Sequence, residues 1–344
     1  MRFTLAWLKE HLETTAPLDA IAEKLTAIGL EVDKVTDRGA SLAPFRVASV
    51  LTAEAHPNAD RLRVCTVDAG AGVVQVVCGA PNARAGMKAV FAGAGSVLPG
   101  NGLTLKPSKI RGVESNGMLV SERELGLSEE HDGIIDLPLD ARVGEPFAAV
   151  LGLDDPVIDL ELTPNRADCA AVRGIARDLA AAGLGRLKPL TRAEEVAGGY
   201  DSPIAWAIEG DGNACPYVAG RHFRGLKNGP SPRWLQQRLR AIGLRPISAL
   251  VDITNFVTFD LGRPLHVFDA KKLSGKTLGM RRARLGEELA GLNGKTYPLD
   301  DGMTVIADGA GVQGLGGILG GAASGVGEET TEVFLEVALF DPTA

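Results

Sequence analysis

The chain has 344 residues, of which 45% are hydrophobic and 23% are charged, and its formal net charge is −7 at pH 7. This composition is that of a globular protein and excludes an intrinsically disordered chain, and the length allows two or three domains. The negative net charge argues against a uniformly basic nucleic-acid-binding protein.

The sequence predicts neither a membrane span nor a secretion signal. It has no run of 18 or more apolar residues, and Lys9, Glu10 and Glu13 interrupt the region where a signal peptide needs an unbroken apolar core. The four cysteines are scattered without a C-x-x-C pair, which indicates reduced, packed thiols and not a zinc site or a disulfide framework. We therefore expect a cytoplasmic protein whose chain binds no metal.

The first half of the chain changes from helical to strand periodicity. Residues 4–39 are predicted to be helical, because leucine and isoleucine recur there at steps of three and four residues. Pro17 suits the start of the second helix, and Gly29 suits its end. Residues 44–150 instead show short strand patterns punctuated by glycine and proline, which favours a small closed barrel or a sandwich.

The pattern then returns to helix over residues 150–190, followed by a predicted linker over residues 190–203. Residues 204–344 mix helix and strand, and the chain stops soon after a strand pattern. We therefore expect this sequence to be a piece of a longer protein.

Two local signals stand out in this last region. The stretch "SPRWLQQRLRAIGLR" predicts an amphipathic helix that Ser231 caps, with Pro232 in its first turn and Gly243 at its end. Asn293-Gly294 predicts a two-residue hairpin turn.

Charge is distributed unevenly along the second half. Residues 221–245 contain seven cations and no acid, residues 271–284 contain six cations and no acid, and the stretch from residue 300 onward has eight acids and no Lys or Arg. Such blocks either attract a polyanion locally or form solvated faces that pair with the acidic stretch. Charge alone leaves both interpretations open.

Common nucleotide and metal motifs do not fit. "SGKT" and "NGKT" lack the first glycine of a P-loop, and the glycine clusters at 70–72, 93–95 and 314–317 miss the spacing of a dinucleotide-binding loop. The histidines show no H-E-x-x-H spacing, and no G-x-S-x-G is present. A site for ATP, NAD or zinc carried by this chain alone is therefore disfavoured.

Several longer motifs occur in a fixed order. "HPNADRLRVC", "VCGAPNARAG" and "KIRGVESNGMLVSERELG" together resemble the tRNA-binding oligonucleotide/oligosaccharide-binding (OB) barrel found in several aminoacyl-tRNA synthetases. "GLRPISALVDITNFVTFDLGRPLHVFDAKKL", "GGILGG" and "VFLEVALFDP" are similar to the editing domain of the bacterial phenylalanyl-tRNA synthetase beta subunit. The resemblance to that family covers essentially the whole chain, and the family's later domains are absent from it.

This resemblance implies a multidomain α+β protein. The implied parts are an N-terminal α+β domain (1–39 plus 151–195), an inserted tRNA-binding OB-fold β-barrel (40–150), and a mixed α/β B3/B4-like editing domain (204–344) that is incomplete at its C-terminus. The implied function is tRNA binding and the hydrolysis of mischarged tyrosyl-tRNA(Phe), with amino-acid activation on a separate alpha subunit.

The resemblance also assigns two sets of site residues. The implied editing pocket consists of Glu336, His266, Arg245, Thr254, Asn255, Gly316, Gly317 and Gly320. The implied tRNA-binding residues are Arg61, Arg63, Lys109, Arg111, Ser115 and Asn116.

Within the implied pocket, Glu336 reads the hydroxyl group of tyrosine, and His266 positions the terminal ribose or the attacking water. The family usually has alanine where Gly316 lies, which predicts a slightly roomier pocket. Thr254 and Asn255 are expected on an apolar strand. Without the resemblance, the pattern favours an outward-facing strand acid at Glu336, and a hydrogen-bonded structural histidine at position 266 stays open.

The implied partners are tRNA(Phe) and the alpha subunit, in a heterotetramer of two alpha and two beta chains, without a membrane. ATP and Mg²⁺ are implied for the holoenzyme, and no cofactor is expected on this part of the chain. A non-catalytic tRNA- or RNA-binding scaffold and a free-standing aminoacyl-tRNA deacylase remain open as alternatives.

Overall fold

A computed structural model describes residues 1–190, 198–209 and 214–341. The chain divides into two compact units. The first unit combines Met1–Lys34 with Ile158–Ala344, and the second unit is Val35–Val157. Within the described ranges, no helix is both long and apolar enough to cross a membrane. Residues 191–197, which make up much of the predicted linker, lie outside these ranges.

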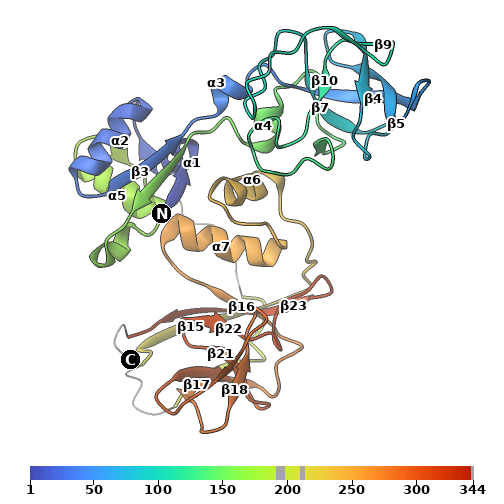
Figure 1. Cartoon of the computed structure of the whole chain (residues 1–344). Coiled ribbons are helices and arrows are strands. Elements are labelled where there is room, and N and C mark those ends of the chain that lie inside the picture. The colour runs from blue at the N-terminus through green and yellow to red at the C-terminus, as the bar shows by residue number, and fades with distance from the viewer. Residues whose placement is uncertain (191–197, 210–213, 342–344) are drawn as a thin grey trace. The chain divides into compact units, whose positions relative to one another are not determined.

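The N-terminal part of the first unit packs helices on a three-stranded sheet with the strand order β1-β12-β3 (Figure 1). The elements are β1 (Arg2–Thr4), α1 (Leu5–His11), β2 (Leu12–Glu13), α2 (Leu18–Ala27), β3 (Glu31–Thr36), β12 (Val157–Glu161), η1 (Pro164–Cys169), α5 (Val172–Ala181) and β13 (Arg186–Leu187). Phe3, Trp7, Leu25, Ile158 and Ile175 are fully buried in the core between the sheet and the helices.

The predicted limits of α2 are confirmed, since Pro17 precedes its first residue and Gly29 follows it with φ +84°. The prediction of helix throughout residues 4–39 and 150–190 is wrong, because β3 and β12 are neighbouring strands of the sheet. The β-branched Val32, Val35 and Thr36 favour the extended conformation, and pairing with β12 then fixes it.

The second unit is a sheet in the order β10-β7-β4-β5-β6, with β11 also paired to β7. Its elements are α3 (Gly39–Leu42), β4 (Arg46–His56), β5 (Ala59–Asp68), β6 (Val73–Cys78), β7 (Lys88–Ala92), β8 (Ser108–Ile110), β9 (Val113–Ser115), β10 (Met118–Leu119), β11 (Asp136–Leu137) and α4 (Phe147–Leu151). The prediction of strands is therefore confirmed for this region.

The strand ladder of the second unit does not close into a barrel, because no strand pairing joins β6 to β10 within residues 35–157. Residues just before β10 nevertheless reach β6. The Asn116 N–H donates to the Gln75 carbonyl at 2.9 Å, and the Ser115 hydroxyl accepts from the Val77 N–H at 3.0 Å. These two bonds link the two ends of the sheet where a ladder is missing.

The C-terminal part of the first unit contains two larger sheets and a hairpin (Figure 1). The sheets have the orders β14-β17-β20-β21-β22 and β15-β23-β16. Their strands are β14 (Ala205–Ile208), β15 (Tyr217–Arg224), β16 (His266–Asp269), β17 (Thr277–Arg282), β20 (Thr304–Ala307), β21 (Val312–Leu315), β22 (Leu319–Gly320) and β23 (Glu332–Leu339). The hairpin joins β18 (Glu288–Ala290) to β19 (Thr296–Pro298) through a loop longer than the predicted two-residue turn, with Gly294 at φ +76°.

Two helices, α6 (Arg233–Ala241) and α7 (Ala249–Leu261), pack against the N-terminal core of the same unit. The rings of Trp7 and Phe256 stack with centroids 5.4 Å apart, and the Trp7 indole N–H donates to Asp260 at 2.7 Å. Gly243 ends α6 as predicted, with φ +87°. The predicted capping role of Ser231 is wrong, because its hydroxyl donates to the buried carboxylate of Asp252 in α7 instead.

Candidate functional site

A pocket of about 370 Å³ lies in the C-terminal part of the first unit. Strands β16, β21, β22 and β23 contribute to its walls, which are mostly apolar. Four of the eight predicted pocket residues line it, namely His266, Gly317, Gly320 and Glu336. Residues that are 70 positions apart in the sequence are therefore brought to one cavity by pairing of β16 with β23.

Glu336 sits at the centre of β23, and its side chain is buried, with 4% exposure. Among the described residues its Oε2 atom has no hydrogen-bond partner. Burial disfavours the charged carboxylate and raises the pKa of Glu336 to about 7. The expectation of an outward-facing strand acid is therefore excluded, and burial favours the protonated form of the carboxyl group in the pocket.

His266 is the direct cross-strand partner of Glu336 in the antiparallel pairing of β16 with β23. Its ring packs edge-on against Phe268 with the centroids 4.4 Å apart, and its buried Nε2 atom has no partner among the described residues. Burial lowers the pKa of His266 to about 4, so the imidazole is neutral at physiological pH. A neutral ring can donate from one nitrogen and accept at the other.

Bare glycine backbone makes room for the His266 imidazole and for the Phe340 ring. A Cβ atom built on Gly320 would lie 2.3 Å from Cε1 of His266, so any side chain there would displace the imidazole. A Cβ on Gly316 or on Gly317 would lie 2.9 Å from the Phe340 ring, which therefore rests directly on this backbone. Gly316 adjoins the pocket without lining it.

The other three predicted pocket residues do not line this pocket. Arg245 is exposed in the connection between α6 and α7. Thr254 and Asn255 lie in α7, so the expectation that they belong to a strand is wrong. Their β-branched neighbours favour a strand locally, but packing of Phe256 and Phe259 on the N-terminal core selects the helix.

The sequence interpretation missed several lining residues, including Arg263, Ile318, Leu319 and Phe340. Each lies within four positions of a residue that it did name, in "GRPLHVFD", "GGILGG" or "VFLEVALFDP". A search for all side chains of these three segments, not only the polar ones, would have found them.

The second unit carries the predicted nucleic-acid contacts. Arg61 and Arg63 project from β5, and Lys109 and Arg111 belong to the β8–β9 hairpin, all four being exposed. Asn116 follows this hairpin and is also exposed.

Ser115 differs from the other predicted contacts, because it is buried with 2% exposure. Its hydroxyl accepts from the Val77 N–H and donates to the Gly117 carbonyl, at 3.0 and 3.1 Å. The expectation of a surface hydroxyl at this position is therefore wrong, and Ser115 instead ties the hairpin to β6.

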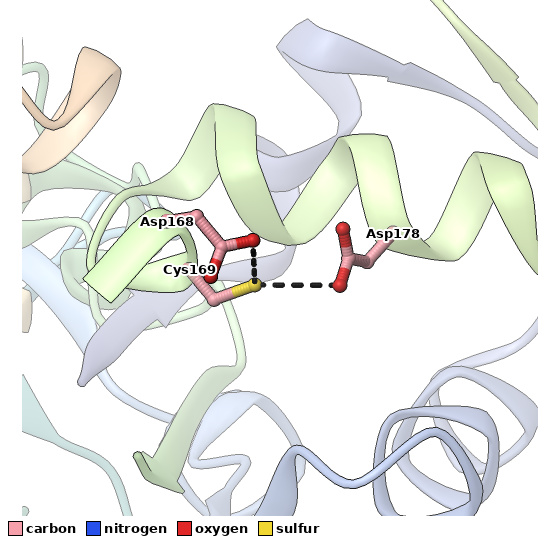
Figure 2. A group of neighbouring side chains, drawn as sticks. All are labelled: Asp168, Cys169 and Asp178. Carbon is pink, nitrogen blue, oxygen red and sulfur yellow. Dashed lines mark hydrogen bonds between the residues drawn. The ribbon is translucent and has the colours of Figure 1, made fainter. Parts of the chain in front are cut away.

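One group of side chains has the spacing of metal ligands, since the candidate ligand atoms of Asp168, Cys169 and Asp178 lie within 4.8 Å of one another (Figure 2). The carboxylates are already engaged, because Arg166 and Arg177 each form ion pairs with both Asp168 and Asp178. Burial raises the pKa of the Cys169 thiol to about 12, so it keeps its proton at neutral pH. A neutral thiol and two arginine-bound carboxylates do not fit a magnesium site, which needs free oxygen ligands.

Comparison with known families identifies the type of domain in each of the two regions. Residues 45–146 match the family described as "Putative tRNA binding domain", and residues 214–344 match the family described as "B3/4 domain". The first match covers most of the second unit, and the second match contains the pocket. The chain is thus a protein that combines these two domain types.

Individual relatives narrow this class. The chain is 58% identical to the phenylalanine–tRNA ligase beta subunit of Rhodospirillum rubrum, over 99% of this chain and 43% of that protein. It is 60% identical to that of Mesorhizobium japonicum, over 99% of this chain and 42% of that protein. An N-terminal fragment of the phenylalanyl-tRNA synthetase beta subunit from Pyrococcus horikoshii is 17% identical, with a TM-score of 0.32, over 55% of this chain and 57% of the fragment.

The chain spans less than half the length of the curated relatives that it matches. Over that length it is a homologue of phenylalanine–tRNA ligase beta subunits, and the resemblance noted in the sequence is confirmed.

Proposed function

We propose that this chain belongs to the beta subunit of a phenylalanine–tRNA ligase and that its pocket hydrolyses mischarged tyrosyl-tRNA(Phe). The observation that carries the proposal is the buried carboxyl group of Glu336, which lines an apolar cavity and has an oxygen atom without a described partner. A buried polar atom without a partner is costly, so a ligand group that hydrogen-bonds to it gains that free energy on binding.

The chemistry of editing needs such a group. Tyrosine differs from phenylalanine by one added hydroxyl, and a hydrophobic pocket rejects an added hydroxyl only about a hundredfold. A second site must therefore select tyrosine positively. The phenol satisfies Glu336, whereas the phenyl ring of phenylalanine leaves the carboxyl group buried and unpaired.

We assign His266 a positioning role. At a pKa of about 4 the imidazole is a weak base, which does not suit a general base that works near neutral pH. Its Nε2 atom is instead available to hydrogen-bond to a ribose hydroxyl or to a water molecule in the pocket. The absence of a side chain at Gly320 leaves the space that the imidazole ring occupies.

The second unit is proposed to bind tRNA as an OB-type barrel through Arg61, Arg63, Lys109, Arg111 and the Asn116 side chain. Exposure of these side chains supports this role, and so does the approach of β6 to the segment before β10. Cations and acids are nearly balanced in this region, so binding is expected to be weak and sensitive to salt.

The proposed substrate, partners and location of the whole protein are taken from its relatives. It includes tRNA(Phe) as substrate, an alpha subunit that activates phenylalanine with ATP and Mg²⁺, assembly of two alpha with two beta chains, and a cytoplasmic location. We keep the domain limits 1–39 plus 151–195, 40–150 and 204–344 as part of it. Helices α6 and α7, though in the last range, pack on the N-terminal core.

Deacylation of tyrosyl-tRNA(Phe) by the complete enzyme tests this function. We expect Glu336→Ala to slow the reaction about 10- to 100-fold, which corresponds to the loss of about 1–3 kcal/mol of polar recognition. Deacylation of phenylalanyl-tRNA(Phe) by the same variant is the control and should change much less. An unchanged rate on the tyrosyl ester would remove Glu336 from the mechanism and favour a non-catalytic RNA-binding scaffold.

A further inference from the structure

The tip of the β8–β9 hairpin contains an unusual backbone conformation. Arg111 has φ +50°, and it is the one non-glycine residue with positive φ among the described residues. Arg111 and Gly112 form the two-residue connection between β8 and β9, with Gly112 at φ +90°. A two-residue turn of this type favours asparagine or glycine at its first position, because other side chains are strained there.

The turn between β4 and β5 holds this strained residue from outside. The Asn58 side-chain amide donates to the Arg111 carbonyl at 3.1 Å, although the two residues are 53 positions apart. His56 hydrogen-bonds through Nε2 to the carbonyl of Ile110, also at 3.1 Å. Two successive carbonyl groups at the hairpin tip are therefore fixed by two side chains of one turn.

The tautomer of His56 is set by a third bond. The backbone N–H of Asn58 donates to Nδ1 of His56 at 3.0 Å, so Nδ1 is the acceptor and Nε2 carries the proton that reaches Ile110. His56 is buried, with 5% exposure, whereas Pro57 and Asn58 are exposed. The segment "HPN" (56–58) is thus a turn whose hydrogen bonds fix the tip of the β8–β9 hairpin. These bonds account for its occurrence directly before β5.

The base of the β8–β9 hairpin is also held by hydrogen bonds. Gln75 in β6 donates through its side-chain amide to the Glu114 carbonyl at 2.8 Å, and its own carbonyl accepts from the Asn116 N–H. The cationic side chains of the hairpin lie in solvent, as do Ser108 and Glu114. Lys109 has 70% side-chain exposure and a loose ion pair with Glu114 at 3.8 Å, while Arg111 has no ion pair within the described residues.

We propose that His56 and Asn58 are positioning residues that hold Arg111 in its left-handed conformation so that its guanidinium contacts a phosphate of the RNA backbone. The proposal rests on the proposed tRNA binding by the second unit. Strained residues persist where the surrounding structure over-determines them, and they cluster at functional sites. An asparagine at position 111 would relieve the strain, but it would supply no cation to the phosphate.

A double-mutant cycle in the complete protein tests this inference, with an unmodified tRNA(Phe) transcript as the probe and filter binding at two salt concentrations. Arg111→Asn should weaken binding several-fold and lower the salt slope by about one ion, while the thermal midpoint stays equal or rises. Asn58→Ala should weaken binding to a similar degree. It should have no further effect when Arg111→Asn is already present, because the contact that it positions is gone.

Asn101→Ala is the control, because the Asn101 side-chain oxygen accepts only a local bond, from the Leu103 N–H at 2.9 Å, in another exposed turn of the second unit. It should leave tRNA affinity unchanged. Independent, additive losses from Asn58→Ala and Arg111→Asn would overturn the inference, as would a lowered thermal midpoint with unchanged affinity in Asn58→Ala. Absence of tRNA binding by the parent protein would instead refute the proposed function of the second unit.

Discussion

The pocket of the first unit and the hairpin of the second unit present their polar groups in opposite ways. In the pocket, Oε2 of Glu336 and Nε2 of His266 are buried and have no partner among the described residues. At the hairpin, the side chains of His56, Asn58 and Gln75 hydrogen-bond to backbone carbonyls, and the cationic side chains are exposed. A single hydrogen bond to a buried group contributes strongly to binding, because leaving that group unpaired is costly. An exposed charge is screened by solvent, so a cationic side chain must lie close to its phosphate to contribute.

We expect the largest loss of deacylation rate when the space beside the His266 imidazole is filled. Gly320→Ala places a Cβ atom where only 2.3 Å separates it from His266, so the ring must move. A shift of about 1 Å in a positioning group lowers rates by about a hundredfold. We expect a loss of this size for tyrosyl-tRNA(Phe) deacylation by the complete enzyme, with tRNA affinity unchanged.

Gly229→Ala is the control for this substitution, because a Cβ atom at Gly229 meets nothing within 4 Å and its φ is not positive. A Gly320→Ala enzyme that deacylates at the parent rate would show that the position of the imidazole does not matter. The pocket would then depend on Glu336 alone.

The pH dependence of stability separates the two buried groups. The pKa of His266 is depressed from 6.5 to about 4, so its contribution is present above pH 6.5 and is lost as the pH falls through 4. The pKa of Glu336 is raised from 4.5 to about 7, so its contribution is present below pH 4.5 and is lost as the pH rises through 7. Between about pH 4.5 and 6.5 the two contributions oppose each other.

Glu336→Gln removes one of these opposing contributions. The free energy of unfolding of the variant should therefore rise with pH over this window by about 2 kcal/mol more than that of the parent chain. Urea denaturation of both chains at pH 4.5 and pH 6.5 measures the difference. Equal pH dependence in parent and variant would mean that Glu336 is solvated and titrates normally, which contradicts the buried pocket.

The sequence predicts individual elements of this fold better than it predicts which strands pair. The strand that carries Glu336 follows from its run of β-branched and aromatic residues, and the ends of α2 and α6 follow from proline and glycine. Local patterns do not determine which strands pair. The meeting of His266 with Glu336 therefore depends on the pairing of β16 with β23, which periodicity does not reveal.

Tertiary packing also overrides local preference in several elements. The residues around Thr254 have strand propensity, yet Phe256 stacks on Trp7 and α7 forms. The motif "HPNAD" predicts a turn, but its bonds to Ile110 and Arg111 join segments that are more than 50 residues apart. Sequence spacing alone carries no information about such partners.

The carboxyl group of Glu336 is buried, and the proposed function requires that a phenol can reach it. Titration of its ¹³C-labelled side-chain carboxyl carbon by NMR, assigned with Glu336→Gln, tests the claim most directly. We expect a pKa of about 7 in the free protein and a lower pKa when tyrosinamide is added, because the phenol donates to the carboxylate and stabilises its charge. A pKa near 4.5 that tyrosinamide leaves unchanged would contradict the account.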